Sequence, residues 1–347
     1  MEQQKNMAKE RNPAFDVMNI LACISVVALH HNTLVHSYTP GAGWVQSLIV
    51  ECFCYWCVPV FLMVSGANLV GYKERYSTGV FLKKRLLRTV IPWLFWSMVF
   101  LVWRIYLKEY EPADLTWRTV AYTILNNKDM TVYWFFSSLF MCYLAMPVLS
   151  SLRNNRRTLW YIVGINFLYH SCRPAVSNWL NLKWNIDAPL GVSLLLFVVL
   201  GYLLSTRPPK KKERIMLYIL GGISVLFRFF YTWIRSEQLQ STDTSIKGYA
   251  LFHSVFFACA VFVLLYRIPW NKVLSQWLKS RIPNISSCSL GIYLIHWMVM
   301  LLEKSWLGLE NNMWTWRILC VPLTYVISLG IVALIRKIPG GRFLTGG

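Results

Sequence analysis

Long, predominantly apolar segments recur along the chain, and they constrain its fold more than any other feature of the sequence. A helix needs about 20 mainly apolar residues to cross the hydrocarbon core of a bilayer. Ten segments meet or approach this length, and the fifth is the shortest. They cover residues 15–37, 44–70, 89–106, 131–150, 158–169, 188–204, 215–234, 248–266, 286–302 and 314–335. The pattern predicts an all-α polytopic membrane protein, a single bundle of about ten transmembrane helices.

The distribution of positive charge predicts how this bundle is oriented. The chain has 35 Lys and Arg against 15 Asp and Glu, and most of the basic residues lie in short clusters between the apolar segments. Ten alternating spans place 24 basic residues on one side of the membrane and 8 on the other. Because basic residues accumulate in cytoplasmic loops, both termini are expected in the cytoplasm. Residues 1–14 and 336–347 then form cytoplasmic tails around a bundle at residues 15–335.

Composition also excludes several classes of protein. With 56% hydrophobic and only 14% charged residues, the chain does not resemble a soluble domain. The charge pattern favours the bilayer over nucleic acid as the basic partner. Cys52, Cys54 and Cys57 lie within one apolar segment without a His or a second Cys pair, so they are expected to pack as small hydrophobic residues. No metal site is expected.

Two predicted helices carry polar residues on one face. Ionisable and polar groups inside a membrane usually face the bundle interior and act on substrates, ions or protons. Helical spacing gathers each group into a stripe, because residues three, four and seven apart share a face. In the first helix the stripe is Asp16, Asn19, Cys23 and His30, and in the ninth it is Ser286, Ser289, Tyr293 and His296.

His30 and Glu51 are expected to lie at the same depth in the membrane. Each is about ten residues from the short turn near Pro40 and Gly41 that joins the first two helices. If their faces meet, the carboxylate would orient the imidazole and form an acid-base pair with it. Two unrelated polar residues near an interface are an equally open interpretation.

A basic cluster precedes the third apolar segment. Lys84, Arg85 and Arg88 recur at helical spacing, so their charged groups are expected to converge at the inner interface. Such a cluster could hold phosphate groups through charge-assisted hydrogen bonds. The alternative is ordinary anchoring against anionic lipid.

Five motifs in this order resemble the acyltransferase 3 family of integral membrane acyltransferases, over essentially the whole chain. The first two are Phe15-Asp16-Val17-Met18-Asn19 through His30, and Val58-Pro59 through Ser65-Gly66. The others are Phe81 through Pro92, Tyr133-Trp134-Phe135 with Tyr143 and Pro147, and Ser289 through Tyr293 to His296. The family fold is a ten-helix bundle.

The resemblance implies transfer of an acyl group, most often acetyl, from cytoplasmic acyl-CoA to a sugar hydroxyl of a surface or lipid-linked glycan. His30 would be the general base, oriented by Glu51. Lys84, Arg85 and Arg88 would hold the coenzyme A phosphates. The residues placed near the substrates are Asn19, Ser65, Tyr293 and His296. Similar members modify bacterial surface polysaccharides, which implies a multi-pass protein of the bacterial cytoplasmic membrane.

This chain departs from the family at one position. The family carries an Arg before the His of the first helix, and Asn19 stands there. The substitution leaves two interpretations open, either a different acyl donor or a neighbouring cation such as Arg88.

Two other classes of function are compatible with the sequence. A transporter or flippase of lipid-linked sugars or acyl groups would also need an aromatic-rich bundle, although the two halves of the chain show no repeat. A non-catalytic member is the other alternative, against which His30, Ser65-Gly66 and the basic cluster argue. The oligomeric state is not readable from the sequence.

Overall fold

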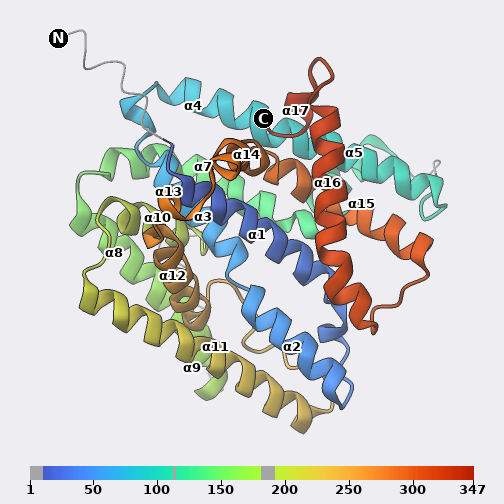
Figure 1. The fold of residues 1–347 in the computed structure, drawn as a ribbon, viewed down its shortest axis with the longest axis horizontal. Helices are drawn as coiled ribbons and strands as arrows, with labels where there is room; N and C mark the ends of the chain where they lie inside the picture. Colours follow the sequence, from blue (N-terminus) through green and yellow to red (C-terminus); the bar gives the residue numbers. More distant parts are fainter. Residues whose placement is uncertain (1–10, 112–114, 181–191) are drawn as a thin grey trace.

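The computed structural model describes residues 11–111, 115–180 and 192–347, and the regular elements in these ranges are all helical (Figure 1). The first half contains α1 (Pro13–His31), α2 (Ala42–Cys54), α3 (Cys57–Leu69), α4 (Thr78–Arg85), α5 (Ile91–Tyr106), α6 (Trp117–Leu125), α7 (Trp134–Leu152), α8 (Arg156–Asn166) and α9 (Arg173–Leu180). The second half contains α10 (Leu195–Thr206), α11 (Lys211–Leu239), α12 (Phe252–Arg267), α13 (Trp270–Val273), α14 (Gln276–Ser287), α15 (Ser289–Leu307), α16 (Cys320–Ile335) and α17 (Gly341–Leu344).

The described residues contain six helical segments that are long and apolar enough to cross a membrane. These are Pro13–His31, Ala42–Glu74, Thr78–Tyr106, Thr131–Leu152, Lys211–Leu239 and Thr315–Ile335. A seventh is formed if α14 and α15, which meet at an angle of 68°, are one span. The prediction of an all-α multi-pass membrane protein is therefore confirmed.

Three of the ten predicted spans form shorter helices. The segments at 158–169, 188–204 and 248–266 correspond to α8, α10 and α12, which have 11, 12 and 16 residues. Residues 188–191 of the second of these lie outside the described ranges. The ninth predicted span is not one straight helix, because the chain bends between Ser287 and Ser289. The total of ten spans stays a prediction.

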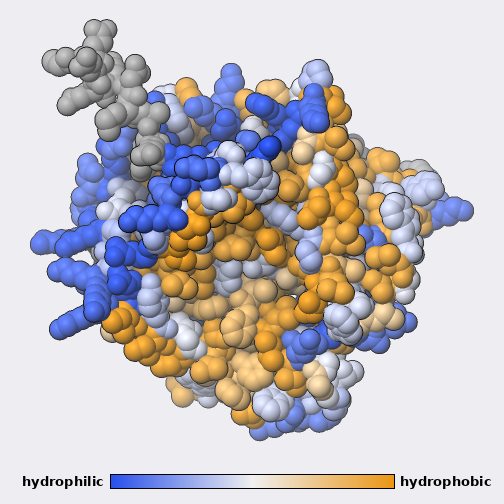
Figure 2. All heavy atoms as spheres, viewed as in Figure 1, coloured by the Kyte–Doolittle hydropathy of each residue, from blue (hydrophilic) through white to orange (hydrophobic). Residues whose placement is uncertain are grey.

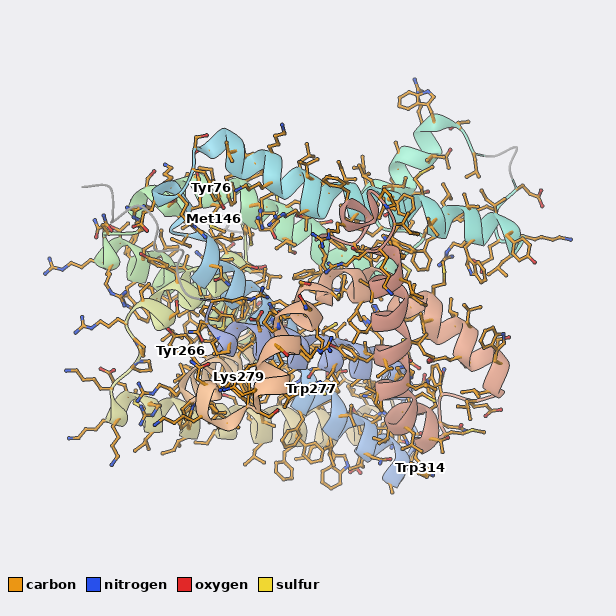
Figure 3. The ribbon with its side chains drawn as sticks, turned by 45° about the horizontal axis from the view of Figure 1, so that its top comes forward. Tyr76, Met146, Tyr266, Trp277, Lys279 and Trp314 are labelled. Carbon is orange, nitrogen blue, oxygen red and sulfur yellow. The ribbon has the colours of Figure 1, made fainter. Side chains whose placement is uncertain are left out.

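Side-chain contacts sort the connecting loops into two groups. One group is joined by the bonded pairs Lys73–Ser151, Arg153–Glu74, Arg156–Thr206, Tyr266–Ser205 and Arg336–Ser287. The other is joined by Lys247–His36, Thr242–Val35, Arg317–Gly43 and Asn178–Ser245. The two groups match the two sets of loops that the predicted alternation of spans places on opposite sides of the membrane. We call the side of the first group the first side and that of the second group the second side. Tyr76, close in sequence to Lys73 and Glu74 of the first group, lies far in Figure 3 from Trp314, which is close in sequence to Arg317 of the second. Which side faces the cytoplasm stays a prediction.

The surface between these two sides is largely apolar. Large hydrophobic side chains are exposed along α5, α7, α11 and α16, including Val102, Val148, Ile219 and Leu334, each about 60% exposed. Apolar residues dominate the middle of the face in Figure 2, and hydrophilic residues gather toward its margins. Exposed apolar area of this extent indicates contact with lipid.

The core contains a very close crossing of α3 and α10. A Cβ atom built on Gly66 would lie 1.9 Å from the carbonyl oxygen of Val198, and one built on Gly201 would lie 1.9 Å from that of Met63. Backbone atoms cannot yield as a flexible side chain can. Membrane helices that approach this closely require small residues at the crossing. Gly66 of the Ser65-Gly66 motif therefore fixes the position of α3 against α10.

The close crossing predicts a stability difference between two glycine substitutions. Gly201→Ala should lower the unfolding temperature of the purified protein, because the added methyl group forces α3 and α10 apart and overpacking costs about 1–3 kcal/mol. Gly222→Ala is the matched control, since a Cβ atom at Gly222 of α11 meets nothing within 4 Å. Equal thermal stability of both variants in detergent would contradict the close crossing.

Candidate active site

The polar stripe of α1 lies against the polar stripe at α14 and α15. Three contacts at successive levels join them, and they are Asn19 with Ser286 (3.4 Å), Cys23 with the carbonyl of Ser289 (3.7 Å) and His30 with His296 (2.6 Å). Helical spacing accounts for the stripe of α1 and for Ser289, Tyr293 and His296 of α15, whereas Ser286 precedes the bend between α14 and α15. The meeting of the two stripes places His30 inside the bundle rather than toward lipid.

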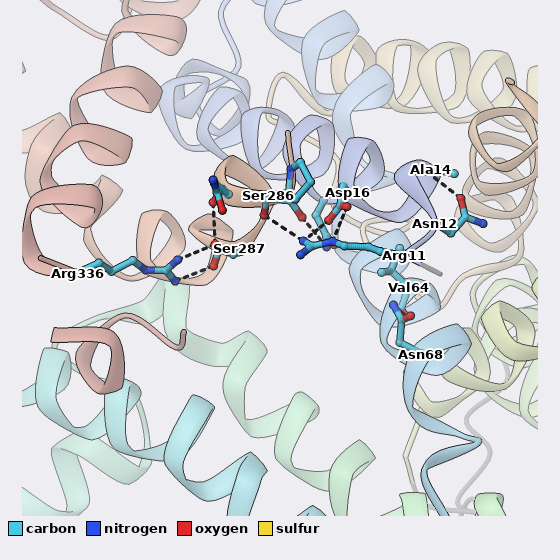
Figure 4. A network of polar contacts seen from close by, with 12 residues as sticks. Arg11, Asn12, Ala14, Asp16, Val64, Asn68, Ser286, Ser287 and Arg336 are labelled. Carbon is cyan, nitrogen blue, oxygen red and sulfur yellow. Dashed lines mark hydrogen bonds and ion pairs between the residues drawn. The ribbon is translucent and has the colours of Figure 1, made fainter. Parts of the chain in front are cut away.

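The start of α1 is fixed by local polar contacts (Figure 4). Asn12 caps the helix by accepting a hydrogen bond from the backbone N–H of Ala14 at 3.0 Å, and Pro13 suits the first turn. Arg11 donates to both carboxylate oxygens of Asp16, at 2.7 and 2.6 Å, and to the carbonyl of Pro283 at 3.0 Å. Asp16 therefore serves as an anchor of α1 on α14.

A cavity of about 270 Å³, here called the Arg85 cavity, lies next to this contact. Its polar lining comes from α1, α3, α4 with the turn that follows it, α7, α14 and α15. It consists of Asn19, Ser65, Asn68, Arg85, Thr89, Tyr143, Ser286, Ser287, Ser289 and Tyr293. Ser287 also bonds with Arg336, which belongs to the first side. The Arg85 cavity therefore lies toward the first side, and four of the predicted site residues line it, which are Asn19, Ser65, Arg85 and Tyr293.

Arg85 supplies the positive charge of this cavity. Its guanidinium lies 5.7 Å from the ring centroid of Phe81 and 5.6 Å from that of Tyr143, within cation–π range. Its Nε is buried and has no hydrogen-bond partner in the described part of the chain. The helix changes to a π-helical turn at Leu86–Val90, directly after Arg85, and such turns occur frequently at functional sites. The cation thus stands in the same cavity as Asn19.

The predicted basic cluster is divided in the structure. Lys84 and Arg88 line a different cavity of about 590 Å³, here called the basic cavity, together with Arg336, Lys337 and Arg342 from the C-terminal segment. The three charged groups were expected to converge, but Arg85 lines one cavity while Lys84 and Arg88 line another. Neighbouring positions on a helix point in different directions, which accounts for the difference. The basic residues of the C-terminal segment were not singled out from the sequence, since only the fold brings them beside α4.

A third cavity of about 420 Å³, here called the His30 cavity, lies toward the second side. Its polar and aromatic lining consists of His30, His36, Glu51, Tyr55, Trp134, Lys247, Tyr249 and Tyr293. Tyr249 stacks on Tyr55 at 4.1 Å and on Trp134 at 5.5 Å between ring centroids. Lys247 Nζ donates to Nδ1 of His36 at 3.1 Å, and burial together with this ammonium lowers the pKa of His36. His36 is therefore a neutral acceptor at neutral pH.

Glu51 shares a cavity with His30, but its charged partners are cations. Its carboxylate lies 3.3 Å from Nη2 of Arg228 and 3.9 Å from Nζ of Lys247. Arg228 in turn covers the ring of Tyr55 at 3.4 Å from its centroid. The expected Glu51–His30 pair is thus corrected, since in the described residues the ring partner of His30 is His296. Arg228 could not be assigned to Glu51 from the sequence because 177 positions separate them.

The buried Glu51–Arg228 pair predicts a large loss of stability when its anion is removed. Glu51→Gln leaves the guanidinium of Arg228 without a buried counter-charge, and breaking such a pair costs about 3–5 kcal/mol. The matched control is Glu74→Gln, because Glu74 pairs with Arg153 at 3.0 Å but its side chain is 65% exposed. An exposed pair contributes below about 1 kcal/mol. Thermal unfolding in detergent compares them, and equal shifts would contradict a structural role for Glu51.

The Arg85 and His30 cavities share three lining residues, which are Val26, Val58 and Tyr293. These residues come from α1, α3 and α15. The hydroxyl of Tyr293 donates to the carbonyl of Val132, which fixes the ring in this position. We call these three residues the partition. A polar cavity with a cation on one side and a cavity with an imidazole on the other thus meet inside the bundle.

His296, the fourth residue placed near the substrates, lines neither cavity. It is fully buried, and its bond to His30 is its link to the His30 cavity. Among the described residues of the predicted external loops, Lys247 lines the His30 cavity, whereas His170 and Cys172 line neither cavity.

These features define a multi-pass membrane protein with a polar site enclosed by its helices. The chain belongs to the acyltransferase 3 family, whose profile, described as an acyltransferase domain, matches residues 12–333. No curated protein matches the chain, and no solved structure matches it. The match covers nearly the whole described bundle and confirms the resemblance found in the motifs. The protein is therefore a membrane acyltransferase.

Proposed function

We propose that the protein transfers an acyl group, with acetyl as the first candidate, from cytoplasmic acyl-CoA to a sugar hydroxyl of a surface or lipid-linked glycan. The observation that carries the proposal is the meeting of the Arg85 and His30 cavities at the partition of Val26, Val58 and Tyr293. Each cavity offers the chemistry that one of the two substrates requires.

The Arg85 cavity suits the acyl-pantetheine arm of the donor. Its lining alternates apolar side chains such as Phe61 and Leu139 with hydroxyl and amide groups such as Ser65 and Asn68. An arm with methylene and amide groups needs this mixture. The free Nε of Arg85 would donate to an amide carbonyl or a phosphate oxygen of the donor.

The basic cavity would take the phosphate end of the same donor. Arg336 bonds with Ser287, and Ser287 lines the Arg85 cavity, so the two cavities are neighbours. Lys84, Arg88, Lys337 and Arg342 add positive charge, and the described lining residues include no Asp or Glu side chain. With the first side facing the cytoplasm, as the basic loops predict, the donor would enter from there.

The His30 cavity suits a saccharide acceptor. Aromatic faces of Tyr55, Tyr249 and Trp134 are suited to pack against sugar rings, and Glu51, His36 and Lys247 offer acceptors and donors for hydroxyl groups. In the transfer step His30 would take the hydroxyl proton as the oxygen attacks the thioester carbon. The C–O bond forms, the C–S bond breaks, and the coenzyme leaves as a thiolate that recovers the proton from His30.

The transfer itself is tested with purified protein in nanodiscs, radiolabelled acetyl-CoA and glycans extracted from the source cells. Release of free coenzyme A together with labelled glycan is the expected result. Mass spectrometry of surface glycans from cells with and without the gene should show a difference of one acyl group. Identical glycans and no labelled acceptor would contradict the proposal, and transport of an unmodified lipid-linked sugar would favour a flippase instead.

A further inference from the structure

Two histidine rings meet inside the bundle with a geometry that the proposed transfer does not by itself require. Nδ1 of His30 lies 2.6 Å from Nε2 of His296, and the two rings are nearly coplanar and meet edge to edge, with 4.9 Å between their centroids and 12° between their planes. The ring of Trp297 packs edge-on against His30 at 5.7 Å. A nitrogen pair at this distance shares one proton, so one ring donates and the other accepts.

The surroundings of His296 decide which ring accepts. Its Nδ1 lies 2.7 Å from the carbonyl oxygen of Tyr293 and 3.3 Å from that of Ile292. Carbonyl oxygens only accept hydrogen bonds, so Nδ1 of His296 carries a proton. In a neutral imidazole the other nitrogen then has a lone pair, and Nε2 of His296 is an acceptor.

A neutral ring at His296 fits its environment. The side chain is 0% exposed, and no carboxylate in the described part of the chain forms an ion pair with it. Glu51, the carboxylate in the adjacent His30 cavity, is paired with Arg228. A cation at His296 would be a buried charge without a counter-ion, which is strongly unfavourable.

We infer that His296 is a positioning residue that holds His30 in its Nδ1-protonated form and so makes Nε2 of His30 the catalytic base. This inference rests on the proposed transfer reaction. Nδ1–H of His30 donates to Nε2 of His296, which leaves the lone pair on Nε2 of His30. That nitrogen has no hydrogen-bond partner in the described residues, and the ring lines the His30 cavity.

The arrangement also accounts for the proton during transfer. Nε2 of His30 takes the acceptor hydroxyl proton, and the resulting imidazolium keeps its bond from Nδ1–H to the neutral His296. The proton on Nε2 then goes to the departing thiolate. His296 exchanges no proton and touches neither substrate, because it orients the base through one hydrogen bond and is itself oriented by the backbone of its own helix turn.

Substitutions of His296 separate positioning from packing. His296→Leu removes the acceptor and should lower kcat about 10²-fold or more, the range of a lost general base, with the donor KM little changed. His296→Gln can place a carbonyl oxygen near the position of Nε2 and should recover at least part of this loss. The control is His253→Gln, because His253 is buried in α12, bonds to the carbonyl of Ile246 and lines neither cavity.

Nitrogen NMR of histidine-labelled protein reads the proton positions directly. The chain has six His, and the spectrum of a His30→Gln variant assigns the His30 signals by difference. We expect His30 protonated at Nδ1 in the wild type and a loss of this preference in His296→Leu. A wild-type His30 protonated at Nε2, or wild-type kcat in His296→Leu, would overturn the inference. If no transfer is found at all, the proposed function fails while the NMR spectrum still decides the proton positions.

Discussion

Replacing His30 by alanine is expected to abolish acyl transfer while donor binding is retained. His30 lines the cavity proposed for the acceptor, and its Nε2 has no hydrogen-bond partner in the described residues. His36 lines the same cavity, but its Nδ1 already accepts a hydrogen bond from Lys247. Loss of a general base lowers rates about 10²–10⁴-fold. Coenzyme A release from radiolabelled acetyl-CoA, measured with and without a glycan acceptor, gives the rate.

The control for this experiment is His170→Ala, because His170 lines none of the three cavities. It should turn over at the wild-type rate. Equal turnover of His30→Ala and wild type would remove His30 from the mechanism. Loss of donor binding in His30→Ala would mean that the residue acts in the Arg85 cavity instead, which its position in the bundle does not predict.

Replacing Arg85 by alanine is expected to weaken donor binding strongly without loss of the fold. Its half-buried guanidinium is the cation of the Arg85 cavity, and a hydrogen bond to a charged group contributes about 1.5–3 kcal/mol. This corresponds to about a 10- to 150-fold rise in Kd. Calorimetric titration of the detergent-solubilised protein with coenzyme A measures the change.

Two neighbouring residues make this experiment discriminating. Lys83→Ala removes an equal charge from the same helix, but Lys83 lines none of the three cavities, so affinity should stay within about twofold of wild type. Arg88→Ala tests the basic cavity, and a weaker Kd there would place phosphate groups beside the C-terminal segment. Unchanged affinity for coenzyme A in both Arg85→Ala and Arg88→Ala would contradict a role in donor binding and favour the alternative, anchoring against anionic lipid.

Helical periodicity predicts the polar stripe of α1 and that of Ser289, Tyr293 and His296 on α15, since spacing along one helix determines which side chains share a face. It does not predict the bend that separates Ser286 from the rest of the second stripe. It could not determine which helices are neighbours. His30 was predicted to face Glu51 because the two lie at similar depth across a short turn, yet α1 turns His30 toward α15 and Glu51 faces Arg228 of α11. Contacts between helices far apart in sequence depend on the packing of the whole bundle.

The basic cluster illustrates a second physical limit of the sequence. Lys84, Arg85 and Arg88 were expected to converge because an ideal α-helix gathers such positions on adjoining faces. The chain instead changes to a π-helical turn at Leu86–Val90, and the fold of the C-terminal segment adds Arg336, Lys337 and Arg342 to one side. The spacing of residues along one helix predicts neither a local change of helix type nor the approach of segments about 250 residues apart in the sequence.

The partition of Val26, Val58 and Tyr293 has an energetic consequence for chemistry across a bilayer. Moving a highly charged coenzyme or a hydrated sugar through hydrocarbon is very costly. With the two cavities facing opposite compartments, as proposed, neither reactant has to make that journey, since only the few atoms of the acyl group change sides. The protein then needs no cycle between inward-open and outward-open states. The acyl group has to pass only the layer formed by the three partition residues, not the full thickness of the membrane.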